Sequence, residues 1–387
     1  MNKLNYPFTA IVGQDELLMG IILNIINPKL GGLLIKGVKG AGKSTAVNSI
    51  TDIIPEIKVL KGCKFNCDPE KPEQWCKKCK DKYSETDKDV IIKEVRRISV
   101  PLGITEDNLL GNIDVELLLK EGTRKFIPGI ITKAHRQILY IDEVNLLPDH
   151  IIDDILDVAA THWNEVEREG FSLSHPSEFL LLGTMNPEEG ELRPQILDRF
   201  PLSVIVNSVS NEKLRTEIIK RNLQFESNKT EFRNKFQKET RELRSLIKLA
   251  RTQLNNVKIK TKYYKIVSKL CSENNIDGQR ADIGIIKTAL THAEKKKKNQ
   301  VEFRHIKQAS KFVLQHRTRA GGLSKPLTET EINDFFKSIN ENEFTQINFS
   351  NTINKKNSLF CDSHLFQQKK NNSDLECLHR LARSSRS

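Results

Sequence analysis

The stretch "GGLLIKGVKGAGKSTAV" constrains the fold of this chain more than any other. The apolar segment Leu33–Lys36 leads into a glycine-rich loop that ends in Gly42-Lys43-Ser44, and a helix-like segment follows. Such a loop must turn backbone N–H groups toward phosphate oxygens, which glycines permit. This order of strand, loop and helix predicts a nucleotide site in which Lys43 reaches the β- and γ-phosphates and the Ser44 hydroxyl ligates Mg²⁺. The other loop residues expected to contact the nucleotide are Gly37, Gly40, Ala41, Gly42 and Thr45.

A pair of acidic residues ends a second apolar segment, "ILYIDEVNLL", which predicts a neighbouring strand. Asp142 can hold the magnesium ion through water, and Glu143 can polarise the attacking water as a general base. Two acids at the end of a strand can also be merely solvated. After a phosphate-binding loop, however, the pair predicts that the nucleotide is hydrolysed as well as bound.

The stretch "FLLLGTMNPEEGELRPQILDRFPL" adds polar side chains after a third apolar segment. The amide of Asn186, at the end of that segment, can orient the lytic water beside Glu143. Arg193 and Arg199 follow, and a guanidinium can neutralise the charge that builds on the transferred phosphoryl group. The alternative for either arginine is a surface ion pair, which is the commoner fate of an isolated arginine. The ordered set of parts favours the functional interpretation.

The first part of the chain alternates short apolar segments with helical patterns. Apolar segments bounded by Gly, Asp or Pro are typical of buried parallel strands. We expect such strands at Leu33–Lys36, Ile138–Ile141, Phe179–Leu182 and Ser203–Val206. The predicted fold class is α/β, with a parallel sheet flanked by helices. We assign it to residues 1–210, with a possible metal-binding cysteine loop at residues 62–80.

Long helical patterns follow without a strand pattern, so we assign residues 211–320 to a second, all-helical domain. Ser210-Asn211 offers an N-cap at its start. We expect helices at Glu212–Leu223, Thr230–Leu254, Lys260–Glu273, Ala281–Lys297 and Glu302–His316. Residues 321–387 are polar and rich in Asn, and we assign them to a low-complexity tail with one short helix near residues 329–339.

The chain has 387 residues and a formal net charge of +12. No apolar run approaches the length of a membrane span, and the start, "MNKLNYPFTAIVGQDE", lacks the apolar stretch of a secretory signal. We therefore expect a cytoplasmic protein with no membrane contact. A positive surplus can indicate a nucleic-acid partner. No recognition motif accompanies the charge, and abundant lysine explains it, so nucleic-acid binding is not expected.

Four of the seven cysteines lie close together in "CKFNCDPEKPEQWCKKC". In a reducing compartment such a cluster suggests metal or redox chemistry rather than disulfides. Four thiolates suit tetrahedral Zn²⁺ or an iron–sulfur cluster, and the alternative is a reduced loop that happens to carry cysteines. The four candidate ligands are Cys63, Cys67, Cys76 and Cys79. Cys271 is expected in the core, and the scattered histidines, among them His135 and His175, are expected at the surface or as caps.

These motifs resemble those of one family, the AAA+ ATPase subunit of magnesium chelatase and its cobalt-chelatase relatives. The resemblance runs from about Tyr6 to Arg319 and is most specific over Leu139–Phe200. It is carried by "FTAIVGQDE", "GVKGAGKST", "VPLGITEDNLLGNID", "LLKEGTRKFIPGIITKAHRQILYIDEVNLLPDH", "DDILDVAATHWNEVEREGFSLSHP", "GTMNPEEGELRPQILDRF" and "DGQRADI". Photosynthetic relatives have a similar "DP-x-x-P" stretch without the cysteines, so the cysteine site is not expected to be needed for ATP hydrolysis.

The resemblance implies an AAA+ core followed by a helical lid, and it implies a role for each matching residue. Lys43 and Ser44 would be the Walker A pair, and Asp142 with Glu143 the Walker B pair. Asn186 would be sensor 1. Arg199 would be an arginine finger that completes a neighbouring subunit's site, and Arg280 would be sensor 2 of the lid. Val12 and Gly13 would belong to a segment near the adenine.

Two insertions are also implied by the resemblance. Glu165–Gly170 would form the tip of an inserted hairpin, and "GITEDNLLGNID" would belong to a helix-2 insertion. Longer relatives continue into a metal-binding, integrin-like domain. Because the sequence stops at Ser387 without one, the chain is expected to be a separate ATPase subunit or a truncated form of a fused one.

The resemblance finally implies partners and a function. Such proteins bind ATP and Mg²⁺, assemble as homo-hexameric rings, and work with a von Willebrand A domain subunit and a large tetrapyrrole-binding subunit. Their ATP hydrolysis drives the insertion of a divalent metal into a tetrapyrrole. The alternative is a MoxR-type AAA+ chaperone that remodels or activates a metalloprotein. The stretches "EVEREG" and "LSHP" favour the chelatase.

Overall fold

The computed structural model describes residues 4–339, except residues 124, 169 and 170. The chain divides into two compact units, Met1–Ile332 and Asn333–Ser387. The predicted tail therefore lies mostly outside the described residues. In its described part, α15 (Glu329–Ser338) confirms the short helix expected there.

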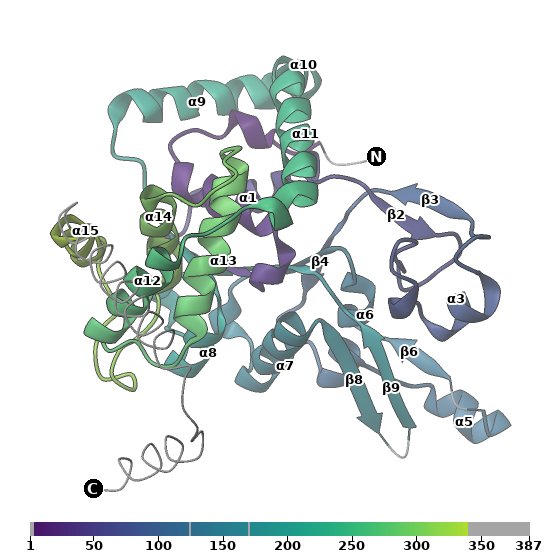
Figure 1. Cartoon of the computed structure of the whole chain (residues 1–387). Coiled ribbons are helices and arrows are strands. Elements are labelled where there is room, and N and C mark those ends of the chain that lie inside the picture. Colours follow the sequence, from purple (N-terminus) through teal and green to yellow (C-terminus); the bar gives the residue numbers. More distant parts are fainter. Residues whose placement is uncertain (1–3, 124, 169–170, 340–387) are drawn as a thin grey trace, which may run out of the picture. The chain divides into compact units, whose positions relative to one another are not determined.

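Five parallel strands form the central sheet of the first unit, in the order β11-β1-β10-β7-β4 (Figure 1). The parallel α/β sheet predicted from the sequence is therefore confirmed. The three central strands are almost fully buried, which agrees with their unbroken apolar sequences. The strands are β1 (Leu33–Gly37), β4 (Arg97–Val100), β7 (Ile138–Ile141), β10 (Leu180–Met185) and β11 (Leu202–Val206).

The edge strand β4 is not among the strands expected from the sequence. It pairs with one neighbour only, and Val100 is its only buried residue. Its sequence, "RISV", alternates polar and apolar residues and lacks the continuous apolar run of a central strand.

Helices cover the sheet and bury apolar stripes against it. In α7 the buried side chains include Ile151, Ile152, Ile155 and Leu156, whose spacing of three and four places them on one helical face. They join the large core cluster of the sheet. Helix α7 ends where His162 takes a left-handed conformation, with φ of 62°. These helices are α1 (Asp15–Ile26), α2 (Lys43–Ser49), α4 (Glu106–Leu110), α6 (Ile130–Ala134), α7 (Asp149–Thr161) and α8 (Pro194–Arg199).

Three antiparallel two-stranded ribbons are inserted between the core elements. The first encloses the cysteine segment with helix α3, and the second encloses α5. The stretch expected in the helix-2 insertion, residues 103–114, contains α4 and the first strand of the second ribbon. The third is the expected hairpin; Glu165–Arg168, expected at its tip, belong instead to its first strand, and residues 169 and 170 lie outside the described residues. The elements are β2 (Ile57–Leu60), α3 (Lys77–Lys82), β3 (Val90–Lys93), β5 (Gly111–Ile113), α5 (Val115–Glu121), β6 (Phe126–Pro128), β8 (Trp163–Arg168) and β9 (Phe171–Pro176).

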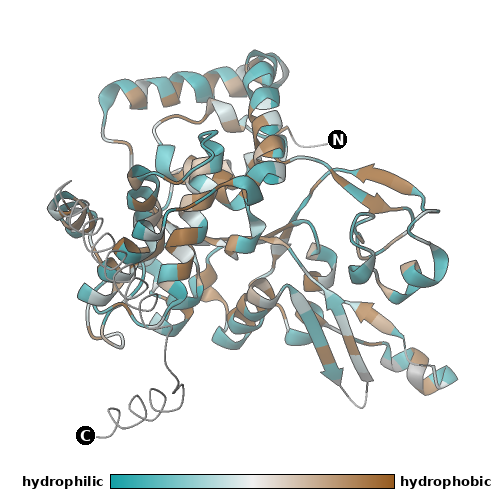
Figure 2. Cartoon of the chain, viewed as in Figure 1, coloured by the Kyte–Doolittle hydropathy of each residue, from teal (hydrophilic) through white to brown (hydrophobic). Residues whose placement is uncertain are grey.

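Helices make up the described chain from residue 212 onward, as the sequence predicts. The first begins where the Asn211 side chain accepts a hydrogen bond of 3.2 Å from the N–H of Leu214, which confirms the N-cap. Figure 2 shows that α3 and much of α9 are hydrophilic, whereas β3 is largely hydrophobic. The helices are α9 (Glu212–Ser227), α10 (Lys229–Lys235), α11 (Gln237–Gln253), α12 (Thr261–Glu273), α13 (Arg280–Lys295) and α14 (Phe303–Leu314).

The single helix expected over Thr230–Leu254 is wrong, because the chain breaks at Phe236 between α10 and α11. The Phe236 ring lies 5.1 Å from the ring of Phe232, and the Arg221 guanidinium lies 5.3 Å from its centroid. The sequence keeps a helical periodicity of apolar residues across Phe236, so the pattern alone does not predict the turn. The aromatic packing against α9 is a tertiary contact that the local pattern does not contain.

The helical region is fixed to the core by side chains that bond to core backbone. His316 Nε2 lies 2.7 Å from the carbonyl oxygen of Phe200, and Gln315 donates to the carbonyl of Ser203 at 2.7 Å. Arg251 donates to the carbonyl of Ile25 at 2.9 Å. The end of α8, the strand β11 and helix α1 are thereby each joined to the helical region.

A buried histidine in this region makes stability dependent on pH. Burial lowers the pKa of His292 to about 3, and the neighbouring His305 and Lys295 act in the same direction. Below the pKa of the unfolded state, near 6.5, His292 binds a proton in the unfolded chain but stays neutral in the folded chain. The free energy of unfolding therefore falls as the pH falls. The loss from this group reaches about 1.4 kcal/mol one pH unit below the unfolded value.

We expect His292→Leu to remove that loss, since His292 Nδ1 has no hydrogen-bond partner among the residues that the structure describes. Urea unfolding of the wild type and the variant between about pH 7.5 and 5.5 measures the difference. His150→Leu, at an exposed site, is the control. Parallel pH profiles of wild type and His292→Leu would contradict the prediction.

No helix in the part of the chain that the structure describes combines the length and apolar character that crossing a membrane requires.

Candidate nucleotide site and cysteine cluster

The carboxyl ends of three adjacent strands meet at one edge of the sheet. Strand β1 leads into the glycine loop, β7 into Asp142 and Glu143, and β10 into Asn186. A cavity of about 380 Å³ opens there. Its lining residues are Lys39, Gly40, Ala41, Gly42, Lys43, Ser44, Thr45, Asp142, Glu143, Thr184, Met185, Asn186 and Glu189. The structure therefore brings the predicted loop, acidic pair and amide together in one site, apart from Gly37, which ends β1.

The glycine loop needs glycine for its backbone conformation. Gly40 and Gly42 have φ of 82° and 85°, values that side chains other than hydrogen rarely allow. A Cβ at either position would meet no atom within 4 Å, so steric contact is not the constraint. Gly42 caps α2, and Lys43 and Ser44 begin that helix. The loop thus delivers an ammonium and a hydroxyl to the cavity from adjacent positions.

The Lys43 ammonium lies against backbone carbonyls at the strand ends. It donates to the carbonyl oxygens of Val38 and Met185, each at 3.3 Å, and to that of Gly37. Burial lowers the pKa of Lys43, and the carboxylate of Asp142 opposes this effect most strongly. The ammonium therefore stands between the loop and the acidic pair.

Two hydroxyl groups orient the Asp142 carboxylate. Tyr140 donates to Asp142 Oδ1 at 2.7 Å, and Thr184 donates to the same oxygen at 2.6 Å. Thr184 Oγ1 in turn accepts from the N–H of Glu143 at 3.2 Å, and Glu143 has a left-handed φ of 54°. Burial raises the pKa of Tyr140 to about 12, so its phenol stays protonated and remains a donor. Both hydrogen bonds go to Oδ1, so Oδ2 is left for a water or an ion.

Sequence reasoning missed Tyr140 and Thr184, although a signal was present. Tyr140 precedes Asp142 by two residues on a strand, and alternate residues of a strand point to the same face. Thr184 stands two residues before Asn186 on the neighbouring strand. The register that places Tyr140 opposite Leu182 was not available from either segment alone.

The variant Tyr140→Phe removes one of the two donors that hold Asp142. Side chains that orient a metal ligand typically affect metal affinity by tenfold or more, so we expect the Mg²⁺ concentration for half-maximal ATP hydrolysis to rise about tenfold. Magnesium titrations of the ATPase rate measure this. Tyr264→Phe, at an exposed tyrosine of α12, is the control. An unchanged magnesium requirement in Tyr140→Phe would show that Thr184 alone suffices.

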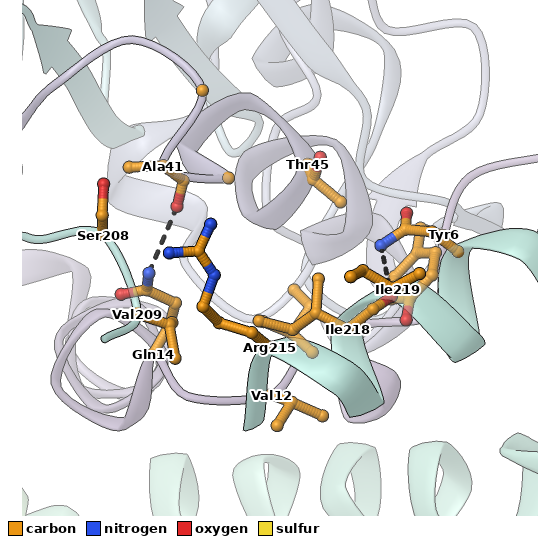
Figure 3. Close-up of a pocket in the computed structure, with 14 residues that line it drawn as sticks. Tyr6, Val12, Gln14, Ala41, Thr45, Ser208, Val209, Arg215, Ile218 and Ile219 are labelled. Carbon is orange, nitrogen blue, oxygen red and sulfur yellow. Dashed lines mark hydrogen bonds between the residues drawn. The ribbon is translucent and has the colours of Figure 1, made fainter. Parts of the chain in front are cut away.

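A second cavity, of about 410 Å³, adjoins the first and shares Gly40, Ala41, Gly42 and Thr45 with it. Val12, one of the two residues expected near the adenine, lines this cavity; Gly13 does not appear among its lining residues. Figure 3 shows the arrangement. The lining residues outside the loop are Tyr6, Ile11, Val12, Gln14, Ser208, Val209, Arg215, Ile218, Ile219 and Asn222.

Two polar residues of the second cavity were not predicted. The Gln14 amide donates to the carbonyls of Ala41 and Asn207, each at 3.2 Å, and so links the loop to the chain after β11. Arg215 comes from α9, and in Figure 3 its guanidinium points toward the loop near Ala41. Apolar residues of α9 cover the other side. The cavity therefore offers an apolar slot beside the phosphate loop.

The three candidate arginines lie outside both cavities. Arg193 pairs with Asp149 at 2.6 Å, and Arg199 pairs with Asp153 and Asp157 of α7. Arg280 pairs with Asp198 at 3.4 Å. Arg199 is the last residue of α8 and Arg280 the first residue of α13, and neither lines the loop cavity of its own chain.

The four cysteines predicted as ligands come together in space. All four Sγ atoms lie within 4.8 Å of one another, and Cys63 Sγ lies 4.0 Å from Cys76 Sγ. Three of the thiols are buried and Cys76 is half-buried. Hydrogen bonds with the neighbouring thiols hold the pKa of Cys63 far below its ordinary value. Hydrogen bonds with Cys63 and Cys76 raise the pKa of Cys67. A four-cysteine cluster that can hold a metal ion is therefore present.

The expected positions of the other cysteines and histidines hold only in part. Cys271 is buried, as predicted, while Cys361 and Cys377 lie outside the described residues. His135 and His175 were expected at the surface or as caps; His135 is the C-cap residue of α6, but both side chains are buried beside the cysteine cluster and not at the surface. Burial lowers the pKa of His135 to about 3 and also lowers that of His175. The imidazoles of His135 and His175 are therefore neutral and pack in the interior.

Known protein families and relatives match most of the chain. The family model "AAA domain (dynein-related subfamily)" matches residues 85–200, and "AAA lid domain" matches residues 265–335. The magnesium-chelatase subunit ChlI homolog of Methanocaldococcus jannaschii is 46% identical over 343 residues, which are 89% of this chain and 92% of that protein. The chloroplastic subunit ChlI-2 of Arabidopsis thaliana is 45% identical over 315 residues, 81% of this chain and 75% of that protein.

A solved structure of the complex between magnesium-chelatase subunits BchI and BchD contains a chain that is 34% identical to this one. The match covers 86% of this chain and all of that chain, with a TM-score of 0.49. Family membership follows from the two relatives above, of which this chain covers three quarters or more. The chain belongs to the ChlI family of magnesium-chelatase subunits and carries the AAA domain and AAA lid of an ATPase.

Proposed function

We propose that this chain hydrolyses ATP as the motor subunit of a metal chelatase that inserts a divalent metal, such as Mg²⁺, into a tetrapyrrole. One observation carries the proposal: Lys43, Ser44, Asp142, Glu143 and Asn186 line one cavity at the carboxyl ends of β1, β7 and β10. Ligands commonly bind at such strand ends in open α/β sheets. The 46% identity to a ChlI homolog supports the chelatase assignment.

The residues of the cavity fit ATP with Mg²⁺. The donor set is a hydroxyl and a carboxylate, Ser44 and Asp142, and Mg²⁺ prefers oxygen ligands. Asp142 keeps its second oxygen because both neighbouring hydroxyls donate to Oδ1. When bound, Mg²⁺ neutralises charge on the β- and γ-phosphates. The apolar slot formed with α9 suits the adenine, and the glycine loop suits the phosphates.

Each residue then has a chemical task. Lys43 binds the β- and γ-phosphates. Glu143 accepts a proton from a water molecule as the water oxygen bonds to the γ-phosphorus, and the bond from that phosphorus to the β–γ bridging oxygen breaks to release ADP. Asn186 orients the water; its Oδ1 accepts from the N–H of Glu188 at 3.3 Å, which leaves its NH₂ group as the donor.

Arg199 serves a neighbouring subunit in this proposal, and Arg280 is sensor 2 of the lid. Arg199 ends α8, and Arg280 begins α13 and pairs with Asp198 of α8; neither lines the cavity of its own chain. An arginine that stabilises the transition state from a neighbour makes hydrolysis depend on assembly, and repeated head-to-tail contacts of this kind close into a ring. We propose the homo-hexamer on this basis, with a boundary between the ATPase core and the lid near residue 210, between β11 and α9.

The proposed partners are a von Willebrand A domain subunit and a large tetrapyrrole-binding subunit. A solved structure of the complex between magnesium-chelatase subunits BchI and BchD contains a chain that is 34% identical to this one, and this supports a partner subunit. The cysteine cluster is proposed to hold Zn²⁺ or an iron–sulfur cluster. Four reduced thiols suit a reducing compartment, so the cytoplasm is the proposed location.

Capture of partners from native extract tests the function. Glu143→Gln is expected to bind ATP without cleaving it and so to hold the ring on its partner. Used as bait with ATP under anaerobic conditions, it should retain a very large chelatase subunit that the Lys43→Ala bait does not. Recovery of an unrelated metalloenzyme with a von Willebrand A protein would instead support the MoxR-type chaperone.

A further inference from the structure

We propose that Cys63, Cys67, Cys76 and Cys79 bind one Zn²⁺ ion, and that the zinc-ordered lobe braces the base of the β8–β9 hairpin. This deepens the metal site proposed above and rests on it. The cysteine lobe is defined here as residues 61–89, the segment between β2 and β3.

The sulfur positions fit a single ion better than a cluster. Four sulfurs that each lie about 2.3 Å from one zinc ion, at the corners of a tetrahedron, are about 3.8 Å apart. All four Sγ atoms here lie within 4.8 Å of one another, and that of Cys63 is 4.0 Å from that of Cys76. An iron–sulfur cluster attaches cysteines to different iron atoms, which spreads the sulfurs more widely. A small contraction brings these four to one metal.

The surroundings of the sulfurs indicate a structural site. Backbone N–H groups point at two of them: that of Phe65 lies 3.3 Å from Cys63 Sγ, and that of Cys76 lies 3.2 Å from Cys67 Sγ. Such hydrogen bonds orient ligands and stabilise thiolates. Four protein ligands, most of them buried, leave no position for a substrate, which is the pattern of structural zinc.

The cysteine lobe has little apolar core besides its thiols. The buried cluster that holds it consists of Leu60, Trp75 and three of the cysteines, with Phe65 and Tyr83 packed at its edge. A segment of this size cannot fold on so small a core, and small domains of this kind use a metal for the purpose. Binding of the ion then supplies the free energy that folds the lobe.

Arg136 clamps the lobe to the ATPase core. It stands just before β7, and its guanidinium donates to the carbonyls of Lys58 and Asn66 at 2.7 and 3.1 Å. It also pairs with Asp68 at 3.1 Å, and both side chains are less than a fifth exposed. Asn66 and Asp68 flank the ligand Cys67. The metal ligand and the clamp therefore share one short segment of the lobe.

The same segment contacts the base of the hairpin. The Phe65 ring lies 5.4 Å from the ring of His175, near the end of β9. His175 Nε2 in turn lies 2.9 Å from Thr132 Oγ1 and 3.1 Å from Asn164 Nδ2, which belongs to β8. Lys71 of the lobe pairs with Glu178 at 3.6 Å. The lobe thus contacts β9 through His175, and His175 in turn bonds to Asn164 of β8.

The contacts lie at the amino ends of β7 and β10, whereas the nucleotide cavity lies at their carboxyl ends. The lobe cannot touch the phosphates from there. Its effect is on the hairpin, so loss of the ion should loosen the hairpin and leave ATP binding intact.

Metal analysis of the full-length wild type tests the first half of the proposal. The protein is purified anaerobically from cells grown with both iron and zinc. We expect about one zinc per chain, and no stoichiometric iron or acid-labile sulfide. Stoichiometric iron, with or without sulfide, would overturn the assignment. So would a metal-free protein, whether its thiols are free or form disulfides by mass spectrometry.

Hydrogen exchange tests the brace. Release of zinc from the wild type with p-hydroxymercuribenzoate, or the double variant Cys67→Ser/Cys76→Ser, should speed exchange about tenfold in peptides that cover β9 and Glu178. Arg136→Gln should do the same while it keeps its zinc, because it removes only the clamp. Lys58→Gln, which breaks an exposed pair with Glu70, is the matched control. Unchanged exchange in Arg136→Gln and after zinc release would overturn the brace.

Nucleotide binding, measured on the same samples, separates this inference from the proposed function. A chain that carries one zinc but neither binds nor cleaves ATP would refute the function and leave the zinc site standing. A chain that cleaves ATP and contains no metal would refute the zinc site and leave the proposed function standing.

Discussion

Replacing Glu143 with glutamine is expected to lower ATP turnover by a factor of about 10² to 10⁴ while ATP still binds, because a positioned general base typically contributes that much. The amide keeps the shape of the side chain but cannot accept the proton. Glu143 also donates its N–H to Thr184 at 3.2 Å, and this backbone contact does not depend on the side chain. The fold of the site should therefore survive the change.

Single-turnover hydrolysis and the affinity for a fluorescent ATP analogue measure the two effects separately. Glu191→Gln, an exposed carboxylate on the segment after Asn186, is the matched control and should behave as the wild type does. If Glu143→Gln retained a tenth or more of wild-type turnover, Glu143 could not be the base. If it failed to bind ATP, its role would be in binding instead.

Replacing Arg199 with alanine is expected to have a comparable effect, through the neighbouring subunit. An arginine finger supplied in trans is worth about 10³ to 10⁵ in turnover. Arg199 is held by Asp153 and Asp157 and lies outside its own cavity, so its loss should not weaken ATP binding by its own chain. Arg304→Ala removes an exposed ion pair with Glu302 and is the control.

Mixing two inactive variants distinguishes a finger in trans from a structural arginine. Lys43→Ala chains cannot bind the phosphates but still offer Arg199, and Arg199→Ala chains do the opposite. In randomly mixed rings, half of the chains have Lys43 and half of their neighbours have Arg199. The mixture should therefore recover about a quarter of wild-type turnover if neighbours complete each site. No recovery in mixed rings of normal size would mean that Arg199 acts within its own chain or only in folding.

Much of the nucleotide site was predictable because its determinants are local. The glycine loop, the Asp142-Glu143 pair and Asn186 each follow an apolar strand directly, and parallel strands bring their carboxyl ends to one edge. The α/β fold and most of the helices follow from the same periodicity. The strand β4 was missed because an edge strand lacks a continuous apolar run.

Features that depend on contacts between distant segments were not predictable. The hydroxyls of Tyr140 and Thr184 meet at Asp142 only because β7 and β10 pair in one particular register. The turn at Phe236 is set by aromatic packing against α9, and the burial of His135 and His175 by the cysteine lobe above them. Cysteine spacing suggested a common ligand set, but only the fold brings the four sulfurs within 4.8 Å.

The position of Asp198 has a mechanical consequence. This carboxylate bonds to Arg280 and Arg317 of the helical region, and the next residue along α8 is Arg199. A rotation of the helical region is therefore expected to move the end of α8 with it, through these two ion pairs. In the proposed ring, such a rotation would advance or withdraw the cation that one subunit offers to the next.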